Sequence, residues 1–239
     1  MRRLTGPVRA GFSRVAWDLR WAAPQLPGPR RPDADDDGGP EGPVAAPGTY
    51  TVTLALRHDG AVREIGTQAF VAEPPAALAG TTARDAGTMQ FRLETSRLQR
   101  AVLGTVAALN EAAQRLAQLK RALDAAPSDT RDLAATARGL EQRIADLRIP
   151  LTGDATIARR NEPTPESITS RLSEVIQYHW SGSGAPTATQ RQNLRWAAEA
   201  FGPVRLKVEQ LVEEDLRALE TAAEAAGAPW TVGRVPKWP

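Results

Sequence analysis

Three aspartates at alternate positions form the pattern in this sequence that comes closest to a metal site. Asp33, Asp35 and Asp37, followed by glycine, match the first half of the calcium loop D-x-D-x-D-G. Alternate carboxylates in such a loop turn toward one hard cation. The twelfth position is Val44, where a bidentate glutamate is needed, and prolines rather than helices flank the segment. We therefore expect a solvated acidic loop without calcium, and no cofactor.

Two histidines and no cysteine restrict the remaining chemistry. Without cysteine the chain has no disulfide, no thiolate nucleophile and no cysteine-ligated zinc. His179 lies at an expected helix end, where packing or a favourable interaction with the helix dipole is favoured over catalysis. His58 lies in an expected turn. Neither histidine is therefore expected to be catalytic.

Paired carboxylates, the requirement of a glycosidase, are not indicated by any spacing in the sequence. Asp18 could be paired with Glu41 or with Glu73, but nothing in their positions supports either pair. Glycine-rich phosphate loops and the motifs G-x-S-x-G and H-E-x-x-H do not occur. We therefore predict no catalytic residue in this chain.

Charge is nearly balanced over the 239 residues, with 30 Lys and Arg against 28 Asp and Glu and a net charge of +2. Neither 1–80 nor 81–239 carries the basic excess that sequence-independent nucleic-acid binding requires. No apolar run reaches the roughly 18 residues of a transmembrane helix. The basic start of the chain is not followed by an apolar stretch either. We expect no nucleic-acid partner, no membrane insertion and no signal peptide.

Alternating apolar residues in the first 80 positions indicate β-strands. Large apolar side chains recur at every second position in 13–21 and again in 49–57. A His-Asp-Gly turn signal then returns the chain through 61–72 as a hairpin. We expect these three strands to form one antiparallel sheet, with Trp17 and Tyr50 on its buried face.

The expected strands are too few for a complete immunoglobulin-like sandwich, which needs about seven. A loop rich in Pro, Gly and Asp over 22–47 separates the first strand from the hairpin. A small sheet of this kind leaves apolar surface and strand edges exposed. Either the sheet packs on the helices that follow, or its other sheet lies outside this chain.

An apolar period of 3.5–3.6 residues begins near residue 85 and indicates helices. A first helix over about 85–125 is predicted to end before Pro127. A second is predicted to start at Ser128 and to stop at Pro150. The seam of the first helix contains Phe91, Leu98, Val102, Leu109, Leu116, Leu119 and Leu123. The seam of the second contains Leu133, Ala137, Leu140, Ile144 and Leu147.

Two further helical segments and a C-terminal tail complete the expected architecture. Thr164 is predicted to cap a third helix, and Thr187 a fourth that Pro203 kinks or splits. Trp230 and Trp238 of the tail are expected to dock on a groove. The fold class is thus α+β, with an incomplete immunoglobulin-like β domain in 1–80 and an antiparallel helical bundle in 81–239.

Several stretches of the sequence resemble one module of large bacterial proteins. They are G-F-S-R-V-A-W-D-L-R at 11–20, A-P-G-T-Y-T-V-T-L at 46–54, F-V-A-E-P-P at 70–75, R-N-E-P-T-P-E-S-I at 160–168, H-W-S-G-S-G-A-P-T at 179–187, A-A-E-A-F-G-P-V at 197–204 and A-G-A-P-W-T-V-G-R-V-P at 226–236. The resembled module is the C-terminal part of BNR-type, sortilin-like β-propeller proteins, often labelled glycosyl hydrolases. In these proteins a small Ig-like β domain and a helical extension follow the propeller.

The resemblance implies a non-catalytic accessory module that packs on or stabilises a β-propeller, in the same protein or in a companion. No Asp-box repeat, S-x-D-x-G-x-T-W, occurs here, so the propeller is missing and the chain is expected to be a truncated or separately encoded tail. The resemblance also implies export in bacteria, and it supplies no catalytic residue.

Two alternatives remain open from the sequence. In the first, the chain is part of a hydrolase, either a glycosidase or a peptidase, whose active site lies in the missing propeller. Carboxylates that converge at the junction of sheet and helices would favour an active site in this chain. Or the chain is a free-standing helical adaptor, for which an apolar stripe on the long helices would stay uncovered. The oligomeric state is left open.

Overall fold

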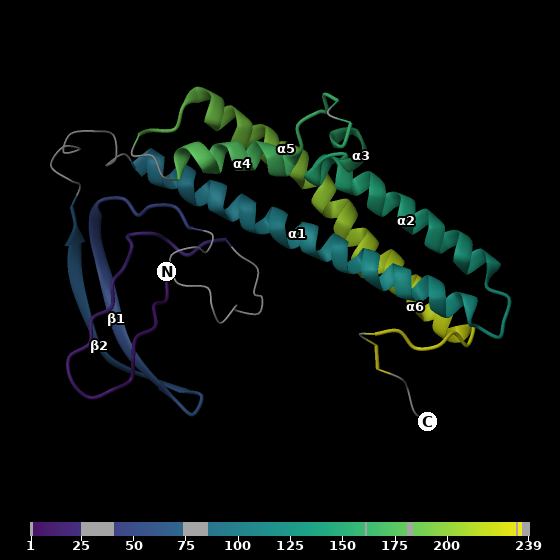
Figure 1. Cartoon of the computed structure of the whole chain (residues 1–239), viewed down its shortest axis with the longest axis horizontal. Helices are drawn as coiled ribbons and strands as arrows, with labels where there is room; N and C mark the ends of the chain where they lie inside the picture. Colours follow the sequence, from purple (N-terminus) through teal and green to yellow (C-terminus); the bar gives the residue numbers. More distant parts are fainter. Residues whose placement is uncertain are drawn as a thin grey trace.

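The chain combines a small β-sheet with a larger set of packed helices (Figure 1). The computed structural model describes residues 2–24, 41–73, 86–160, 162–180, 184–232 and 234–235. The sheet is antiparallel and two-stranded, and the helices that follow it share one hydrophobic core. Over these residues, no helix has the length and apolar character needed to cross a membrane.

The β-hairpin predicted from the alternating residues is confirmed. Strand β1 (Gly48–His58) pairs with β2 (Ala61–Ala72) in antiparallel register. Asp59 and Gly60 between them have φ angles of 47° and 80°. Two consecutive left-handed residues match the right-handed twist of the strands, which is why Asp-Gly is favoured in this turn.

The predicted strand over 13–21 does not form, so the expectation of a three-stranded sheet is wrong. Only an isolated antiparallel bridge between Arg20 and Val44 is present there. Leu19 adopts a left-handed φ of 57°, and the Asp18 carboxylate accepts a hydrogen bond from the backbone N–H of Arg20 at 3.0 Å. This turn interrupts the extended backbone that a strand requires.

The two long helices predicted from the apolar seams are confirmed, with corrected ends. Helix α1 spans Ala86–Asp124 and helix α2 spans Arg131–Thr152. Pro150 does not stop α2, because the helix continues for two residues and thereby buries Leu151 completely. The carbonyl that Pro150 leaves without an intrahelical partner belongs to Asp146, which is exposed to water.

The segment after α2 begins its next long helix later than predicted. Helix α3 (Ala155–Ala158) is a single turn that follows α2, and α4 spans Ile168–His179. The cap of α4 is Ser167, whose hydroxyl accepts from the N–H of Ser170, so the assignment of Thr164 as cap is wrong. Ile168 is buried, and this contact with the core fixes where the helix begins.

The fourth segment starts as predicted, at Thr187. Helix α5 (Ala188–Gln210) opens with a capping box in which Thr187 and Gln190 exchange hydrogen bonds. Pro203 lies inside α5 and does not split it. The helix instead changes to a π-helical segment, η3 (Leu211–Asp215), and then continues as α6 (Leu216–Ala225).

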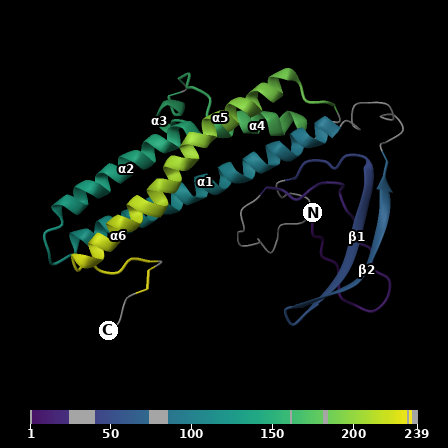
Figure 2. The same cartoon turned by 180° about the vertical axis from the view of Figure 1, so that it is seen from behind.

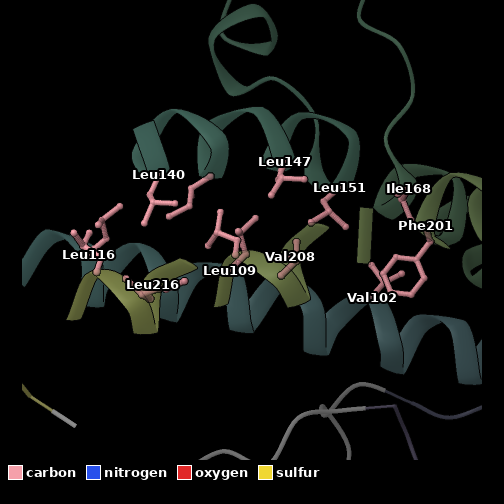
Figure 3. Close-up of a cluster of buried hydrophobic side chains, with 14 of the residues drawn as sticks. Val102, Leu109, Leu116, Leu140, Leu147, Leu151, Ile168, Phe201, Val208 and Leu216 are labelled. Atoms are coloured by element: carbon pink, nitrogen blue, oxygen red, sulfur yellow. The ribbon is translucent and has the colours of Figure 1, made fainter. Parts of the chain in front are cut away.

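A single hydrophobic core lies between the helices (Figure 3). Leucines of the predicted seams of α1 and α2 point toward one another and meet side chains from α4, α5 and α6. Of the predicted seam residues, Leu98 and Leu133 are only partly buried and the others are buried. Viewed from behind, α5 and α6 run along the length of α1 and α2 (Figure 2).

The N-terminal part lies beside the first turns of α1 (Figures 1 and 2). Arg92 of α1 donates from Nη1 to the carbonyl oxygen of Val44 at 3.0 Å. This hydrogen bond joins the helices to the segment that leads directly into β1. The hairpin itself extends into solvent, and nearly every residue of both strands is exposed.

Candidate interaction surface

The larger apolar side chains of β1 lie on one face of the hairpin. Alternate residues of β1 share a face, and each lies opposite a residue of β2 on the same face. We call the following residues the apolar face: Tyr50, Val52, Leu54, Leu56 and Phe70. The opposite face carries threonines, two of which, Thr53 and Thr67, bond to each other at 3.0 Å. Strand β1 is therefore amphipathic, whereas β2 places Gln68 and Arg63 opposite its apolar residues and Val71 and Val62 on the other face.

An aromatic cluster covers one end of the apolar face. The ring of Trp17 lies edge-on to Tyr50 and Phe70, with centroid distances of 5.3 and 6.0 Å, and Trp21 lies 6.3 Å from Tyr50. Tyr50 also donates from its hydroxyl to the carbonyl of Ala46. Edge-to-face pairs contribute about 0.5–1.5 kcal/mol each beyond the area that they bury. Trp17 and Tyr50 thus share a partly buried face, although residue 17 does not belong to a strand.

Hydrogen bonds within the N-terminal segment hold Trp17 in this position. Its indole N–H donates to the carbonyl of Arg20 at 2.8 Å. Asp18 accepts from the backbone of Arg20 and from the guanidinium of Arg2. Partial burial alone would raise the pKa of Asp18, but these hydrogen bonds and the two positive charges together lower it. Asp18 is therefore an ionised structural residue.

Arg20 separates the carboxylates that were considered as an acid–base pair. Its guanidinium contacts Glu41 at 2.9 Å and donates to the carbonyl of Gly42, while its backbone N–H bonds Asp18. The structure thus brings Asp18 and Glu41 to the same arginine. Glu73 follows β2 as an exposed residue. Pairing with arginine keeps Asp18 ionised, the opposite of what a general acid requires.

The middle of the apolar face is uncovered, whereas Leu56 beyond it is half-buried. Val52 and Leu54 are 54% and 62% exposed. A two-stranded hairpin in water is marginally stable unless further strands or a helix cover its apolar side. Uncovered apolar surface of this kind marks sites of protein association. The part of the face around Val52 and Leu54 is therefore the candidate interaction surface.

Carboxylates line two cavities of the helical part, and several of them are held by caps or ion pairs. A cavity of about 310 Å³ beside α3 and α4 is lined by Asp154 and Glu166, and one of about 550 Å³ between α1 and α6 is lined by Glu111 and Glu220. Asp154 caps α3, and hydrogen bonds from Thr156 lower its pKa. Glu166 contacts an arginine at 3.1 Å. Neither cavity lies at the junction of sheet and helices.

The candidate calcium ligands, Asp33, Asp35 and Asp37, lie outside the described residues. Within the described ranges, no group of three His, Cys, Asp or Glu side chains is placed to hold a metal ion.

His179 is a buried residue of the helical core. Its ring lies edge-on to Phe91 at 4.9 Å. Burial, together with the nearby positive charges of Arg92 and Arg191, lowers its pKa to about 4. His179 is therefore neutral near pH 7, so it acts by packing and not as a cation at the helix end. His58 is the last residue of β1, exposed and next to Asp59 of the turn.

The apolar seam of the long helices is not available to a partner. Phe91, Val102, Leu109, Leu116 and Leu123 of α1 are all buried in the shared core. An uncovered stripe was the feature expected of a helical adaptor, and α1 does not present one.

Sequence reasoning missed two arginine contacts between distant residues. Arg92 is buried and donates a hydrogen bond to Val44. It lies next to the apolar seam, and the apolar period gives no sign that this arginine is buried. Arg115 of α1 binds Glu220 of α6 through both carboxylate oxygens, at 2.7 and 2.9 Å. Both residues appear in the sequence as ordinary charges of solvated helix faces, because the signal for their pairing is tertiary.

The described part of the C-terminal tail is held by Arg234. This side chain donates to the carbonyl of Glu220 at 2.9 Å, pairs with Glu224 and lies over the ring of Trp230 at 4.8 Å. Trp230 remains partly exposed. Trp238, the other tryptophan that was expected to dock, lies outside the described residues.

Comparison with known proteins adds no relative: no protein-family model, no curated protein and no solved structure matches the chain.

Proposed function

We propose that the chain is a non-catalytic accessory module that packs on a β-propeller of a glycosyl-hydrolase-like protein. In this proposal residues 1–80 are an incomplete immunoglobulin-like β domain, and residues 81–239 are an antiparallel helical bundle. The propeller belongs to the same protein or to a companion. One observation carries the proposal: the apolar side chains of β1 are covered at Tyr50 by an aromatic cluster but are exposed at Val52 and Leu54.

The distribution of buried residues supports this assignment of roles. The helices bury their apolar side chains in a core of their own. The hairpin instead presents Val52 and Leu54 to water, beside an aromatic cluster that is already ordered. An exposed apolar patch next to rigid aromatic side chains is typical of a protein interface. The sequence resemblance names the partner, since the resembled module follows a β-propeller.

Calorimetric titration of the chain with a purified propeller domain of the BNR, sortilin-like class tests the proposal. We expect a complex that the double variant Val52→Thr, Leu54→Thr weakens about ten-fold or more, since each lost buried methyl group contributes roughly 0.8 kcal/mol. The matched control is Val232→Thr, Val235→Thr, which changes exposed valines of the tail. Equal weakening by both double variants, or no complex with any propeller of this class, contradicts the proposal.

The pure chain is not expected to hydrolyse glycosides. Asp18 is ionised beside Arg2 and Arg20, and Asp154 is ionised as a helix cap. A panel of aryl glycosides, including sialosides, checks this. Turnover that disappears with a single carboxylate variant would instead support the hydrolase alternative.

A further inference from the structure

The end of α2, the short helix α3, the start of α4 and the middle of α5 come together at one place in the fold (Figure 1). The cavity of about 310 Å³ lies there, and we call it the α3 cavity. Apolar side chains form most of its described wall: Ile149, Pro150, Ile157, Pro165, Ile168 and Ala200. Small-molecule sites are concave and mostly apolar, with volumes of about 300–1,000 Å³. The α3 cavity therefore has the size and the lining of a small-molecule site.

Three charged side chains line the same cavity, and two of them are acidic: Asp154, Glu166 and Arg171. Glu166 contacts Arg171 at 3.1 Å. Arg171 also donates from Nη1 to Oδ1 of Asn193 at 3.3 Å, and its guanidinium lies over the ring of Trp196 at 5.0 Å. These contacts hold the guanidinium beside Glu166 and against α5. The charge that no other side chain of the wall balances is therefore that of Asp154.

Asp154 uses one of its two carboxylate oxygens to fold the chain. Its Oδ1 caps α3 and accepts from the backbone N–H and the hydroxyl of Thr156, at 2.8 and 2.6 Å. These hydrogen bonds lower the pKa of Asp154, and the exposed Arg160 acts in the same direction. Among the described residues, no donor is bonded to Oδ2. An ionised carboxylate with unused acceptor capacity thus lines an apolar cavity.

We propose that the α3 cavity binds a small organic cation, a protonated amine that carries one aromatic or branched aliphatic group. The apolar group packs against the isoleucines and prolines of the wall, and the ammonium pairs with the carboxylate of Asp154. An apolar cavity of roughly 150 Å³ holds a benzene ring. A cavity of about 310 Å³ therefore has room for one ring and a short ammonium arm. The site is separate from the hairpin and does not depend on the proposed accessory role.

The wall disfavours two other kinds of occupant. An anion would have to displace Glu166 from Arg171, and it would still lie in a cavity that Asp154 lines. Protein segments dock along strand edges or elongated grooves. The α3 cavity, with side chains of four elements in its wall, has volume for little more than one ring. A small cation with an apolar body fits both the charge and the size.

Isoleucine methyl groups provide the readout. The chain has six isoleucines, of which Ile149, Ile157 and Ile168 line the cavity and Ile65, Ile144 and Ile176 do not. Phenethylammonium at millimolar concentration should shift the δ-methyl NMR signals of the three lining isoleucines of the full chain and leave the other three in place. No shift of the lining isoleucines, or shifts of equal size in all of them, overturns the proposal.

Matched probes and one variant test the charge. Phenethyl alcohol and phenylpropionate have the same ring and a similar arm without a positive charge, and they should bind about ten-fold more weakly than phenethylammonium. Asp154→Asn keeps a good helix cap and should weaken phenethylammonium about ten-fold without changing the affinity for the alcohol. The control is Glu162→Gln, which removes an exposed carboxylate of the same loop and should change affinity less than about two-fold. Equal binding of the three probes, tighter binding of phenylpropionate, or equal effects of the two variants overturns the proposal.

A second pair of variants tests the apolar wall. Ala200 belongs to the wall and Ala198 of the same helix does not, and both residues are exposed. Ala200→Leu should therefore fold, narrow the cavity and weaken phenethylammonium about ten-fold or more, whereas Ala198→Leu should change its affinity less than about two-fold. Equal effects of the two leucines overturn the proposal.

Two further measurements separate this site from a protein interface. A short peptide with lysine next to phenylalanine that shifts the same isoleucines and binds ten-fold or more tighter than phenethylammonium would assign the cavity to a protein partner and overturn the proposal. The double variant Val52→Thr, Leu54→Thr should bind phenethylammonium as the wild type does. Loss of binding in that variant would show that the isoleucine shifts do not report a separate site, and it would also overturn the proposal.

Discussion

The charge state and the burial of individual ionisable residues in this protein depend on their neighbours in the tertiary structure. His179 is kept neutral by burial and by two arginines. Glu220, only 7% exposed, remains next to the core because Arg115 binds both of its oxygens. Neither environment can be inferred from sequence neighbours, since the residues that create it lie far away along the chain.

The pH dependence of stability should reveal His179. Its pKa is about 4 in the folded chain, against 6.5 for an unperturbed histidine, so the unfolded state binds the extra proton first. Stability contributed by the neutral ring is therefore present above about pH 6.5 and is lost as the pH falls toward 4. The loss should be on the order of 2–3 kcal/mol. Urea unfolding of the wild type and of His179→Phe at several pH values measures the difference in unfolding free energy between the two proteins. A difference that is the same at every pH would show that the ring does not titrate in this range.

The Arg115–Glu220 pair should show strong coupling. Arg115→Met leaves a nearly buried carboxylate without its partner and should cost about 2–4 kcal/mol, whereas the double variant with Glu220→Met should cost less than the two single changes together. A double-mutant cycle from denaturant unfolding measures this coupling. Additive single effects would show that the carboxylate is solvated by water instead.

Elements with a long apolar seam could be predicted well, and elements that depend on one backbone angle could not. The seven-residue steps of Val102, Leu109 and Leu116 establish α1, because only a helix places them on one side. Pro150 was assigned as a stop, but burial of Leu151 outweighs the lost hydrogen bond. The 13–21 strand failed at Leu19, whose φ is left-handed beside Asp18, a carboxylate that accepts hydrogen bonds from Arg2 and Arg20; the alternation does not reveal these contacts.

The candidate interaction surface also has features that the sequence pattern predicts and features that it does not. Alternation along β1 predicted that Tyr50 shares a face with Trp17, and the two rings are 5.3 Å apart. Exposure of Val52 and Leu54 could be anticipated only in general, from the small number of strands. A bulge at Ile65, between the pairs Leu54–Gly66 and Ala55–Glu64, has no signal in the sequence except Gly66 beside it.

Replacement of Leu109 tests the helical seam. Leu109 is buried at the centre of the core, and Leu109→Ala should lower the free energy of unfolding by about 2–5 kcal/mol through lost contacts and a residual cavity. The control is Leu206→Ala on α5, whose side chain is 56% exposed and whose change should stay within about 0.5 kcal/mol. Similar melts for the two variants would show that the seam of α1 is not the core.

Stability across the whole molecule should be uneven. The helices share a continuous core, whereas the hairpin depends on the aromatic cluster at one end. Segments with few buried apolar contacts open at lower free energy than the rest of a protein. The isolated chain should therefore have a hairpin that opens without unfolding of α1 and α2.

Hydrogen exchange with Trp17→Ala checks this. Loss of the indole should speed exchange of β1 and β2 and leave residues 98–123 of α1 unchanged. Trp196→Ala, which removes a half-exposed tryptophan of α5, is the control and should leave the hairpin as it is. Faster exchange throughout α1 in the Trp17 variant would mean that hairpin and helices unfold together.

The length of α1 has a mechanical consequence. Its 39 unbroken residues form a rod of about 58 Å at 1.5 Å per residue. One end is tied to the approach to β1 through Arg92, and farther along Arg115 ties it to α6, next to the tail that Arg234 holds. The helix therefore sets a fixed distance between its contact with the approach to β1 and its contact with α6, whatever the hairpin itself does.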